Sequence, residues 1–233
     1  MIYGVIHSGS GLGNQLHRYV GSRTIAEKLG EEWGMVAPEL FKGKDFMDLD
    51  FGKSLSEYHI EQPSGKVIPH TNEIVVDGEM QADCYFDIDK VRQWLKVEPL
   101  DLPDNLCVIN FRGREYAGVP DLFLPKEYWD LAIKEMLETN PEMDFEVHTD
   151  DMETAKRFFP HFHISVGIGY NWRYIRYAKN LILSNSSFAI LPALLNEDTN
   201  VIAPKYWAGY NKGYWQLEQN KYKKFNYIHH EHK

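Results

Sequence analysis

The second half of the chain alternates between short apolar runs and longer amphipathic segments, and this alternation constrains the fold most strongly. The apolar runs predict the strands 107–111, 145–149, 162–166, 181–184 and 201–203. The segments between them predict the helices 126–137, 152–159, 173–178 and 187–195. Strands and helices that alternate with short loops form a parallel sheet wrapped by helices. We therefore expect an α/β fold in this half of the chain.

The start of the chain predicts a second lobe of the same kind. Residues 2–7 are mostly apolar and predict a buried strand, and residues 8–13 form a glycine-rich loop. Apolar residues at helical spacing predict a helix over 14–29, which Gly30 ends. This order of strand, tight loop and helix suits a second sheet with a helix packed on it.

A proline-containing stretch divides the chain. Residues 98–105 carry Pro99 and Pro103, and this composition predicts a linker. A chain of 233 residues has room for one large domain or for two small lobes. We expect an N-terminal lobe over residues 1–100 and a C-terminal lobe over residues 105–233.

The composition excludes several classes of protein. With 43% hydrophobic and 25% charged residues, the chain is an ordinary globular protein. The formal net charge of −9 argues against a partner nucleic acid, because proteins that follow a phosphate backbone are normally basic. No apolar run approaches the roughly 18 residues of a membrane-spanning helix. The first residues lack the features of a signal peptide, and two cysteines make no disulfide framework, so we expect a cytoplasmic protein.

Ligands of parallel sheets bind beyond the carboxyl ends of the strands. In the second half, this rule points to residues 112–116, 149–151, 167–170 and 184–187. Each of these loops carries polar side chains, and the first holds two arginines. We therefore look for a binding site at this edge of the predicted sheet.

The glycine-rich loop is a candidate anion site. Gly11, Gly13, Asn14 and Gln15 stand where a strand passes into a helix, so free backbone N–H groups and the helix dipole point outward. A nicotinamide dinucleotide site would need a glycine at position 14, where Asn stands, so that class of cofactor is disfavoured. The alternative is a tight turn in which Asn14 caps the helix.

Arg112 and Arg114 follow the first predicted strand of the C-terminal half. Two residues apart at a strand end, they share one side, and Gly113 between them allows close approach of a ligand. Guanidinium groups suit bidentate binding of phosphate. The alternative is a surface ion pair with Glu115, which would contribute little to stability.

Two further loops carry small polar or acidic side chains. Ser184, Asn185, Ser186 and Ser187 lead into an apolar helix, and they predict either a phosphate-binding helix start or a redundant helix cap. Asp150 follows a buried strand, where a carboxylate can accept hydrogen bonds from a purine or can cap the next helix. Both alternatives stay open for each loop.

A metal ion is not expected. Two Asp-x-Asp pairs, Asp48 with Asp50 and Asp87 with Asp89, match a pattern of metal-dependent sugar transferases. The pattern is two residues long, so chance matches are common in a chain with 34 acidic residues. Separately, aromatic residues concentrate between Tyr206 and Tyr222, where they offer flat faces to a glycan or pack across the fold.

In combination, these motifs resemble the alpha-1,2-fucosyltransferases (glycosyltransferase family 11) within the fucosyltransferase superfamily. The similar segments are 11–16, 81–86, 110–116, 124–128, 149–151, 184–188 and 202–207. They occur in the family's order and span nearly the whole chain. The chain departs from the family motif at Gly113, where the family has a second arginine, at Glu115, where it has Asp, and at Asn110, where it has His.

The resemblance implies two Rossmann-like lobes of the GT-B-like type, with the nucleotide-sugar donor held mainly by the C-terminal lobe and the acceptor by the N-terminal lobe. It implies inverting transfer of fucose from GDP-fucose to a glycan hydroxyl, without metal or other cofactor. Arg112 is then the catalytic arginine at the donor pyrophosphate, and Glu115 is the candidate base. The donor-binding residues expected are Gly11, Gly13, Asn14, Gln15, Arg112, Arg114, Asp150, Ser184, Asn185, Ser186 and Ser187. Two alternatives stay open, namely a nucleotide-sugar or glycan binding protein without transferase activity and a transferase that uses another GDP-sugar.

Overall fold

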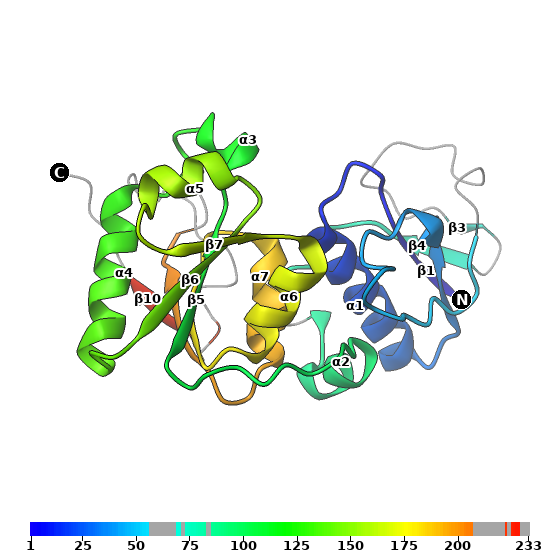
Figure 1. Cartoon of the computed structure of the whole chain (residues 1–233). Coiled ribbons are helices and arrows are strands. Elements are labelled where there is room, and N and C mark those ends of the chain that lie inside the picture. Colours follow the sequence, from blue (N-terminus) through cyan, green and yellow to red (C-terminus); the bar gives the residue numbers. More distant parts are fainter. Residues whose placement is uncertain (56–68, 71–72, 83–84, 207–221, 223–224, 229–233) are drawn as a thin grey trace. The chain divides into compact units, whose positions relative to one another are not determined.

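The structure is a computed structural model that describes residues 1–55, 69–70, 73–82, 85–206, 222 and 225–228. It separates into two compact units, Met1–Val97 and Glu98–Lys233 (Figure 1). Each unit has a sheet of mainly parallel strands with helices packed on it, which confirms the predicted α/β fold class. Most of the aromatic-rich segment, residues 207–221, and Cys84 lie outside the described residues.

Unit 1 is built on a four-stranded sheet. The strands lie in the order β2 (Trp33–Val36), β1 (Ile2–Val5), β4 (Glu73–Val76) and β3 (Pro69–His70). Strand β1 runs parallel to both β2 and β4, and β3 is antiparallel to β4. The helical segments of this unit are α1 (Leu12–Leu29), η1 (Pro38–Leu40) and α2 (Ile88–Trp94). Strand β1 lies between β2 and β4, so the strands that follow it in the chain lie on both sides of it. Ligands of such sheets bind at this kind of switch point, which here is the carboxyl end of β1.

Helix α1 packs on β1 and sets the glycine-rich loop in place. Its residues Leu16, Tyr19 and Val20 are fully buried. The helix begins at Leu12, two residues earlier than the sequence predicts, because Gly11 takes the extended N-cap conformation. It ends at Gly30, whose φ of 67° is left-handed, as expected for a glycine that terminates a helix.

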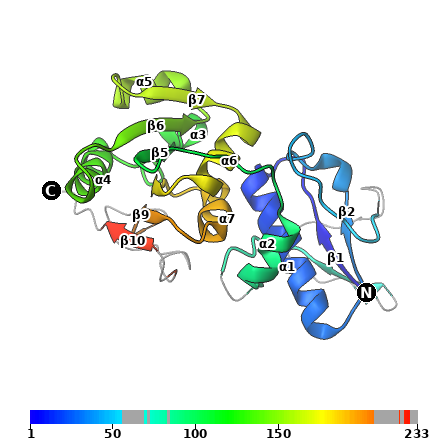
Figure 2. The ribbon, with the colours of Figure 1, turned by 60° about the horizontal axis from the view of Figure 1, so that its bottom comes forward.

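Unit 2 contains a six-stranded sheet whose strands are all parallel. The strands lie in the order β10 (Phe225–Ile228), β9 (Asn200–Pro204), β8 (Asn180–Ile182), β5 (Leu106–Phe111), β6 (Asp144–Thr149) and β7 (His163–Val166). Its helices are α3 (Arg114–Ala117), α4 (Lys126–Thr139), α5 (Met152–Phe158), α6 (Ile168–Tyr177) and α7 (Ser187–Leu195). Helices α4 and α5 cover one face of the sheet, and α6 and α7 cover the other (Figure 2). The chain turns back between β5 and β8, so the switch point of this sheet lies at their carboxyl ends.

The core of unit 2 is rich in aromatic side chains. Phe111, at the end of β5, packs against Trp129 of α4 at 5.4 Å between ring centroids and against Phe159 at 5.5 Å. Both Phe111 and Trp129 are 1% exposed. Aromatic pairs of this kind add about 0.5–1.5 kcal/mol each beyond the burial of their area. The strand that precedes Arg112 therefore ends in a closely packed part of the core.

Two features of unit 2 differ from the predicted elements. Helix α6 begins at Ile168, five residues before the predicted start at 173, because Gly167 enters it with a φ of 138° that other residues rarely adopt. The short helix α3 and the last strand β10 are not predicted at all. The other elements lie within a few residues of their predicted positions, and α7 has the predicted bounds.

Candidate functional site

Arg112 follows β5 and is held by side chains from two loops. Its Nη1 pairs with Asp150, in the loop between β6 and α5, and its Nη2 pairs with Glu115 of α3. Its guanidinium also lies over the ring of Tyr116, 5.4 Å from the centroid. The side chain is 29% exposed. Arg112 is thus oriented at the carboxyl edge of the sheet and still reaches the surface.

The loop after β5 and the loop after β6 are joined by further hydrogen bonds. The backbone N–H of Gly113 donates to Oδ1 of Asp150 over 2.9 Å. The backbone N–H of Arg114 donates to Oδ2 of Asp151 over 3.0 Å, and its Nε donates to the carbonyl of Asp150 over 2.7 Å. Arg114 has a φ of 34°, which is unusual for a residue with a side chain. These contacts place both arginines against one neighbouring loop.

Gly113 is required by the packing of these loops. A Cβ at this position would clash with the Cβ of Asp151 and would lie 2.8 Å from its Oδ2. Real Cβ atoms do not approach other atoms so closely, so no larger residue fits without a shift of the backbone. The position at which the resembled family has a second arginine is therefore closed to any side chain here.

The two consecutive aspartates have different contacts. Asp151 caps α5, since its Oδ1 accepts from the backbone of Thr154 over 3.1 Å and its Oδ2 accepts from the hydroxyl of Thr154 over 2.7 Å. Partial burial raises the pKa of Asp151, but hydrogen bonds from Thr154 and from the backbone of Arg114 hold it below its usual value. Asp150 is not the cap, and its carboxylate holds Gly113 and Arg112 instead.

The serine-rich segment is only partly open. The Ser184 hydroxyl donates to Oδ1 of Asn110 over 2.8 Å, and the Asn185 amide donates to the carbonyl of Leu122 over 2.8 Å. Both side chains are buried and join loops inside unit 2, and their contact with a donor stays a prediction. Ser186 occupies the N-cap position of α7 without a side-chain cap bond. Ser186 and Ser187 are therefore the two residues of the segment that stand at the start of α7.

The glycine-rich loop of unit 1 departs from its predicted form at Asn14. This residue lies inside α1 and is no cap, and its Oδ1 accepts a hydrogen bond from Nε2 of Gln81 over 3.1 Å. Gly13 is buried in the first turn of the helix. Gly9 and Gly11 are exposed, and a Cβ on either would meet no atom within 4 Å. The open part of the loop is therefore 9–11.

Gln15, which is predicted to bind the donor, is held by the protein backbone, and its contact with a donor stays a prediction. The side chain is fully buried. Its Nε2 donates to the carbonyls of His7 at 3.2 Å and Leu40 at 3.1 Å, and its Oε1 accepts from the backbone N–H of Lys42 at 2.9 Å. Because every one of these partners is backbone, Gln15 fixes the loop around β1 from the inside.

A second polar cluster lies at the carboxyl edge of unit 1, and none of the sequence motifs points to it. His7 Nε2 lies 3.0 Å from Oδ1 of Asp77, which directly follows β4. Nη1 of Arg18 lies 3.1 Å from the same oxygen, and Nη2 lies 2.9 Å from Oε1 of Glu79. The sequence shows only a histidine after one strand and an aspartate after another. Because 70 residues separate His7 from Asp77, the two are connected only once β1 is known to pair with β4.

Unit 2 also holds a buried histidine on the face of the sheet that α6 covers. His148 is fully buried, and its Nε2 lies 3.2 Å from Oε1 of Glu146. Its ring stacks on Tyr170 with 5.5 Å between the centroids. Partial burial raises the pKa of Glu146, but hydrogen bonds from His148 and Ser165 hold it below its usual value. These contacts tie α6 to the sheet and lie inside the unit.

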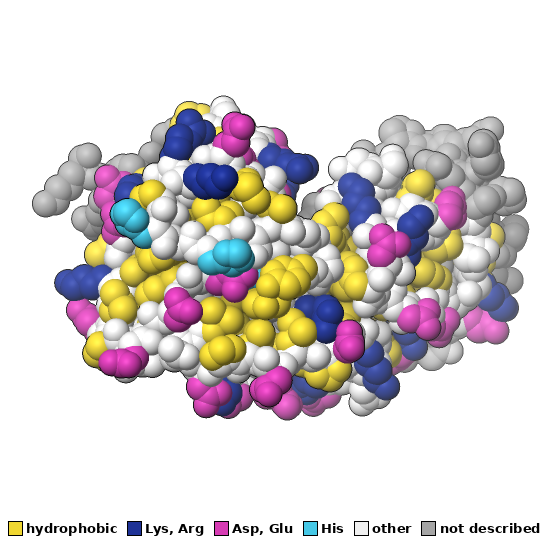
Figure 3. All heavy atoms as spheres, viewed as in Figure 1, with side chains coloured by type: hydrophobic (Ala, Val, Ile, Leu, Met, Phe, Trp, Pro, Cys, Tyr) yellow, Lys and Arg dark blue, Asp and Glu magenta, His cyan; other side chains and the backbone are white. Residues whose placement is uncertain are grey.

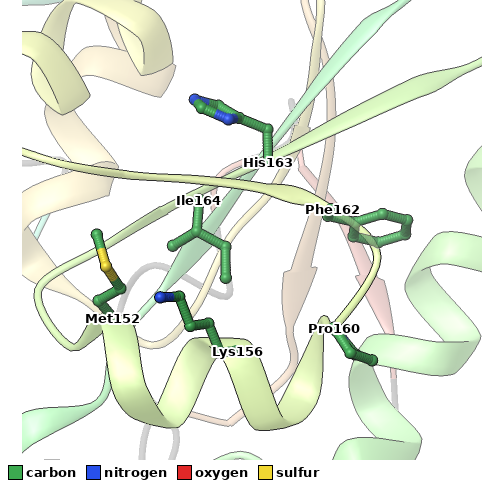
Figure 4. Close-up of a pocket in the computed structure, with 6 residues that line it drawn as sticks. All are labelled: Met152, Lys156, Pro160, Phe162, His163 and Ile164. Atoms are coloured by element: carbon green, nitrogen blue, oxygen red, sulfur yellow. The ribbon is translucent and has the colours of Figure 1, made fainter.

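A surface hollow of about 500 Å³ lies between α5 and β7 (Figure 4). It is lined by Met152, Lys156, Pro160, Phe162, His163 and Ile164. None of the predicted site residues lines it. In the close-up, Ile164 extends from β7 toward Lys156 of α5. Four of the six lining residues are apolar.

The described residues include no cluster of metal ligands. In the part of the chain that the structure describes, no three or more His, Cys, Asp or Glu side chains are grouped so as to hold a metal ion. Asp87, from one of the Asp-x-Asp pairs, caps α2, and its Oδ1 accepts from the backbone of Asp89 over 3.1 Å.

No described helix has the length and apolar character to cross a membrane. On the face drawn in Figure 3, basic and acidic side chains are interspersed over the described surface.

Comparisons with known proteins bear on the fold. No protein-family model matches the chain, and no curated protein matches its sequence. The structure is similar to a crystal structure of NodZ alpha-1,6-fucosyltransferase soaked with GDP-fucose, with a TM-score of 0.54 and 11% identity over 83% of this chain and 91% of that one. It is also similar to a family 9 glycosyl transferase from Veillonella parvula, with a TM-score of 0.56 and 10% identity over 97% of this chain and 85% of that one.

These likenesses establish the architecture. The chain has the α/β fold of GT-B glycosyltransferases, which the sequence analysis expects from its resemblance to fucosyltransferases. Sequence identities of 10–11% concern the fold alone.

Proposed function

We propose that this protein is a glycosyltransferase that moves a sugar from a nucleoside diphosphate to a hydroxyl group of a glycan. Fucose from GDP-fucose is the first candidate donor, with inversion at the sugar carbon and without a metal ion. The observation that carries the proposal is Arg112, which two carboxylates orient at the switch point of the unit 2 sheet. The fold that this chain shares with glycosyltransferases supports it.

Arg112 has the chemistry that this reaction needs. When the bond between the sugar carbon and the phosphate oxygen breaks, the electron pair leaves with the nucleoside diphosphate, and negative charge grows on its terminal phosphate. A guanidinium can grip two of the phosphate oxygens at once. A preorganised donor of this kind typically contributes about 2.7–4 kcal/mol in the transition state. Arg112 is therefore the catalytic residue of the proposal.

The start of α7 supplies a second set of donors beside Arg112. Ser184 contacts Asn110, two residues before Arg112, through a backbone bond of 3.0 Å and a side-chain bond of 2.8 Å. Ser186 and Ser187 then begin the helix, where backbone N–H groups are free for an anion. The donor diphosphate is proposed to bind between Arg112 and this helix start.

Glu115 affects how a diphosphate binds. Both Nη nitrogens of Arg112 are already paired with carboxylates, one with Glu115 and the other with Asp150. A phosphate must therefore replace a carboxylate on Arg112. The Glu115 side chain is 61% exposed and can turn into water, whereas Asp150 is 19% exposed and is also held by Gly113. Glu115 is thus the carboxylate that gives way.

The contacts of Asp150 favour a positioning role over the recognition of a purine. Both of its carboxylate oxygens are engaged, one by the backbone of Gly113 and one by Arg112. We expect Asp150→Asn to weaken the binding of GDP, ADP and UDP alike, because it loosens Arg112. A loss confined to GDP would show instead that Asp150 recognises the guanine.

A binding protein without transferase activity is the second candidate, and Gly113 favours it. The resembled family uses a second arginine at this position, and the packing of Asp151 excludes one here. Arg114 lies one residue further on, but its Nε is bonded to the carbonyl of Asp150. If Arg114 cannot compensate, the protein would bind the nucleotide-sugar without turning it over.

Calorimetric titration with GDP, with and without EDTA, is the first test. We expect saturable binding that EDTA does not change. Arg112→Ala should abolish it, whereas Arg176→Ala should not, and this control is well matched because Arg176 also lies over a tyrosine ring, at 5.0 Å. Mass spectrometry after incubation with GDP-fucose, GDP-mannose and a panel of oligosaccharides then separates the candidates. Binding without transfer or donor hydrolysis supports the binding protein, and absence of GDP binding contradicts both.

A further inference from the structure

Tyr116 contacts Arg112 through its aromatic ring. It lies in α3, and the guanidinium carbon of Arg112 lies over the ring, 5.4 Å from the centroid. This distance is within the roughly 6 Å at which a cation is attracted to the face of an aromatic ring. Both residues belong to unit 2, so the contact depends on that unit alone.

The short helix α3 brings Tyr116 back to Arg112. The backbone N–H of Tyr116 donates to the carbonyl of Gly113 over 2.8 Å, which turns the chain directly after Arg112. The turn is held from outside by Asp150, whose Oδ1 accepts from the backbone N–H of Gly113 over 2.9 Å. As a result, the residues three and four positions after Arg112, namely Glu115 and Tyr116, both contact its guanidinium.

The ring is the part of Tyr116 that holds Arg112. No described residue forms a hydrogen bond with the Tyr116 hydroxyl. Burial raises the pKa of Tyr116, although the positive charge of Arg112 opposes this shift, so the phenol stays protonated at neutral pH. A neutral phenol has no charge that could pair with the guanidinium. The attraction between the two side chains therefore comes from the face of the ring.

The contacts that Arg112 makes with described residues differ in what a phosphate has to displace. Glu115 and Asp150 each occupy one of its Nη nitrogens, and these nitrogens are the donors that a phosphate needs. The ring of Tyr116 attracts the cation without accepting a hydrogen bond from either Nη nitrogen in place of a carboxylate. When a phosphate replaces the exposed Glu115, the ring can therefore stay where it is. Tyr116 is then the contact from α3 that still holds Arg112.

We propose that Tyr116 is a positioning residue for Arg112, and that its ring keeps the guanidinium aimed at the donor diphosphate once Glu115 has given way. This inference rests on the proposed function, in which Arg112 stabilises the departing diphosphate. An arginine that is already held in place loses less conformational freedom when it binds a phosphate. Tyr116 acts through Arg112 and needs no contact of its own with the donor.

The test compares replacements of Tyr116 that lack the ring with one that keeps it. We expect Tyr116→Leu and Tyr116→Met to lower kcat and kcat/KM together by about 10-fold, with the GDP-sugar that the wild type transfers. A 10-fold loss corresponds to about 1.4 kcal/mol, which lies in the usual range of a cation–π contact. The affinity for GDP, measured by calorimetric titration, should fall less. Tyr116→Phe keeps the ring and should keep most of the rate, and melting curves show whether each variant is folded.

Tyr177→Leu is the matched control. The ring of Tyr177 lies 5.0 Å from the guanidinium carbon of Arg176, so this variant removes the same kind of contact from another helix of unit 2. It should transfer at the wild-type rate and bind GDP with the wild-type affinity.

A double variant shows whether Tyr116 acts through Arg112. Arg112→Lys already lacks the planar guanidinium, so adding Tyr116→Leu to it should lower kcat/KM by less than about 2-fold further. A full 10-fold further loss would mean that the two residues act independently, and it would overturn the inference.

Two other results would overturn this inference and leave the proposed function standing. One is wild-type kcat/KM in both Tyr116→Leu and Tyr116→Met, and the other is an equal loss in Tyr116→Phe, which would assign the effect to the hydroxyl. If the wild type binds GDP but transfers no sugar, the same variants are compared by their affinity for GDP, and unchanged affinity in Tyr116→Leu and Tyr116→Met overturns the inference. Absence of GDP binding by the wild type would overturn both the inference and the proposed function.

Discussion

Glycines follow the central strand of the sheet in both units, but for different physical reasons. In unit 2, Gly113 is necessary because Asp151 occupies the space where a side chain would begin. In unit 1, Gly9 and Gly11 have open space around them and no positive φ. The same pattern in the sequence thus marks close packing in one unit and an uncovered backbone in the other.

The two edges also differ in how their polar groups are held. In unit 2, hydrogen bonds between neighbouring loops hold Arg112, and the loops themselves are part of the edge. In unit 1, the buried side chains of Gln15 and Arg18, both from α1, hold the glycine-rich loop and Asp77. Changes in the loops of unit 2 should therefore disturb its edge directly. The edge of unit 1 depends instead on buried side chains of α1.

The largest effect is expected at Gly113. Gly113→Ala should lower the free energy of unfolding by about 3 kcal/mol, the upper end of the usual range for overpacking, because the clash involves a Cβ that cannot move away. Gly9→Ala is the control, and it should change the stability by less than about 0.5 kcal/mol. Urea unfolding of both variants measures this. Equal effects at the two positions would contradict the comparison.

His17 should make unit 1 sensitive to acid. Burial lowers the pKa of His17 to about 4, so the folded state stays neutral while the unfolded state takes up a proton below about 6.5. Stability is therefore lost as the pH falls from about 6.5 toward 4, and the loss at pH 5 should be about 2 kcal/mol. Glu146 and Asp151 in unit 2 have lowered pKa values, so their contribution is lost only at lower pH. Unfolding at pH 7 and pH 5 checks this, and His17→Leu should lack the pH-dependent loss.

A smaller effect should distinguish the serines of unit 2. Ser184→Ala removes a buried hydrogen bond to Asn110 and should lower the free energy of unfolding by about 1 kcal/mol. It should leave the affinity for GDP unchanged. Ser187→Ala, at the start of α7, should leave the free energy of unfolding almost unchanged and lower the affinity for GDP. Melting curves and GDP titrations of both variants decide the matter, and the reverse pattern would remove the helix start from the proposed donor site.

Much of the fold could be predicted from local patterns. The bounds of α7 follow from an apolar run after serines, and the end of α1 follows from Gly30. The early start of α6 could not be predicted, because it depends on the unusual backbone of Gly167 rather than on the periodicity of the residues after it.

The candidate site was less predictable, because its contacts join distant residues. Arg112 was found from its place after a strand, but its partner Asp150 comes from a different loop. Gln15 has the polar side chain of a ligand-binding residue, yet it bonds to the backbone of Leu40 and Lys42, which are more than 20 residues away. His7 and Asp77 are ordinary residues until the order of the strands brings them together.

The most direct test of the account is steady-state transfer by Arg112→Lys beside the wild type, with a melting curve for each. Lysine keeps the positive charge but lacks the planar fork that grips two phosphate oxygens. If Arg112 acts mainly in the transition state, kcat and kcat/KM should fall together by about 100-fold, which corresponds to about 2.7 kcal/mol, while GDP affinity falls less. Full activity of both Arg112→Lys and Arg112→Ala, with unchanged melting, would contradict the central claim that Arg112 drives the departure of the nucleoside diphosphate.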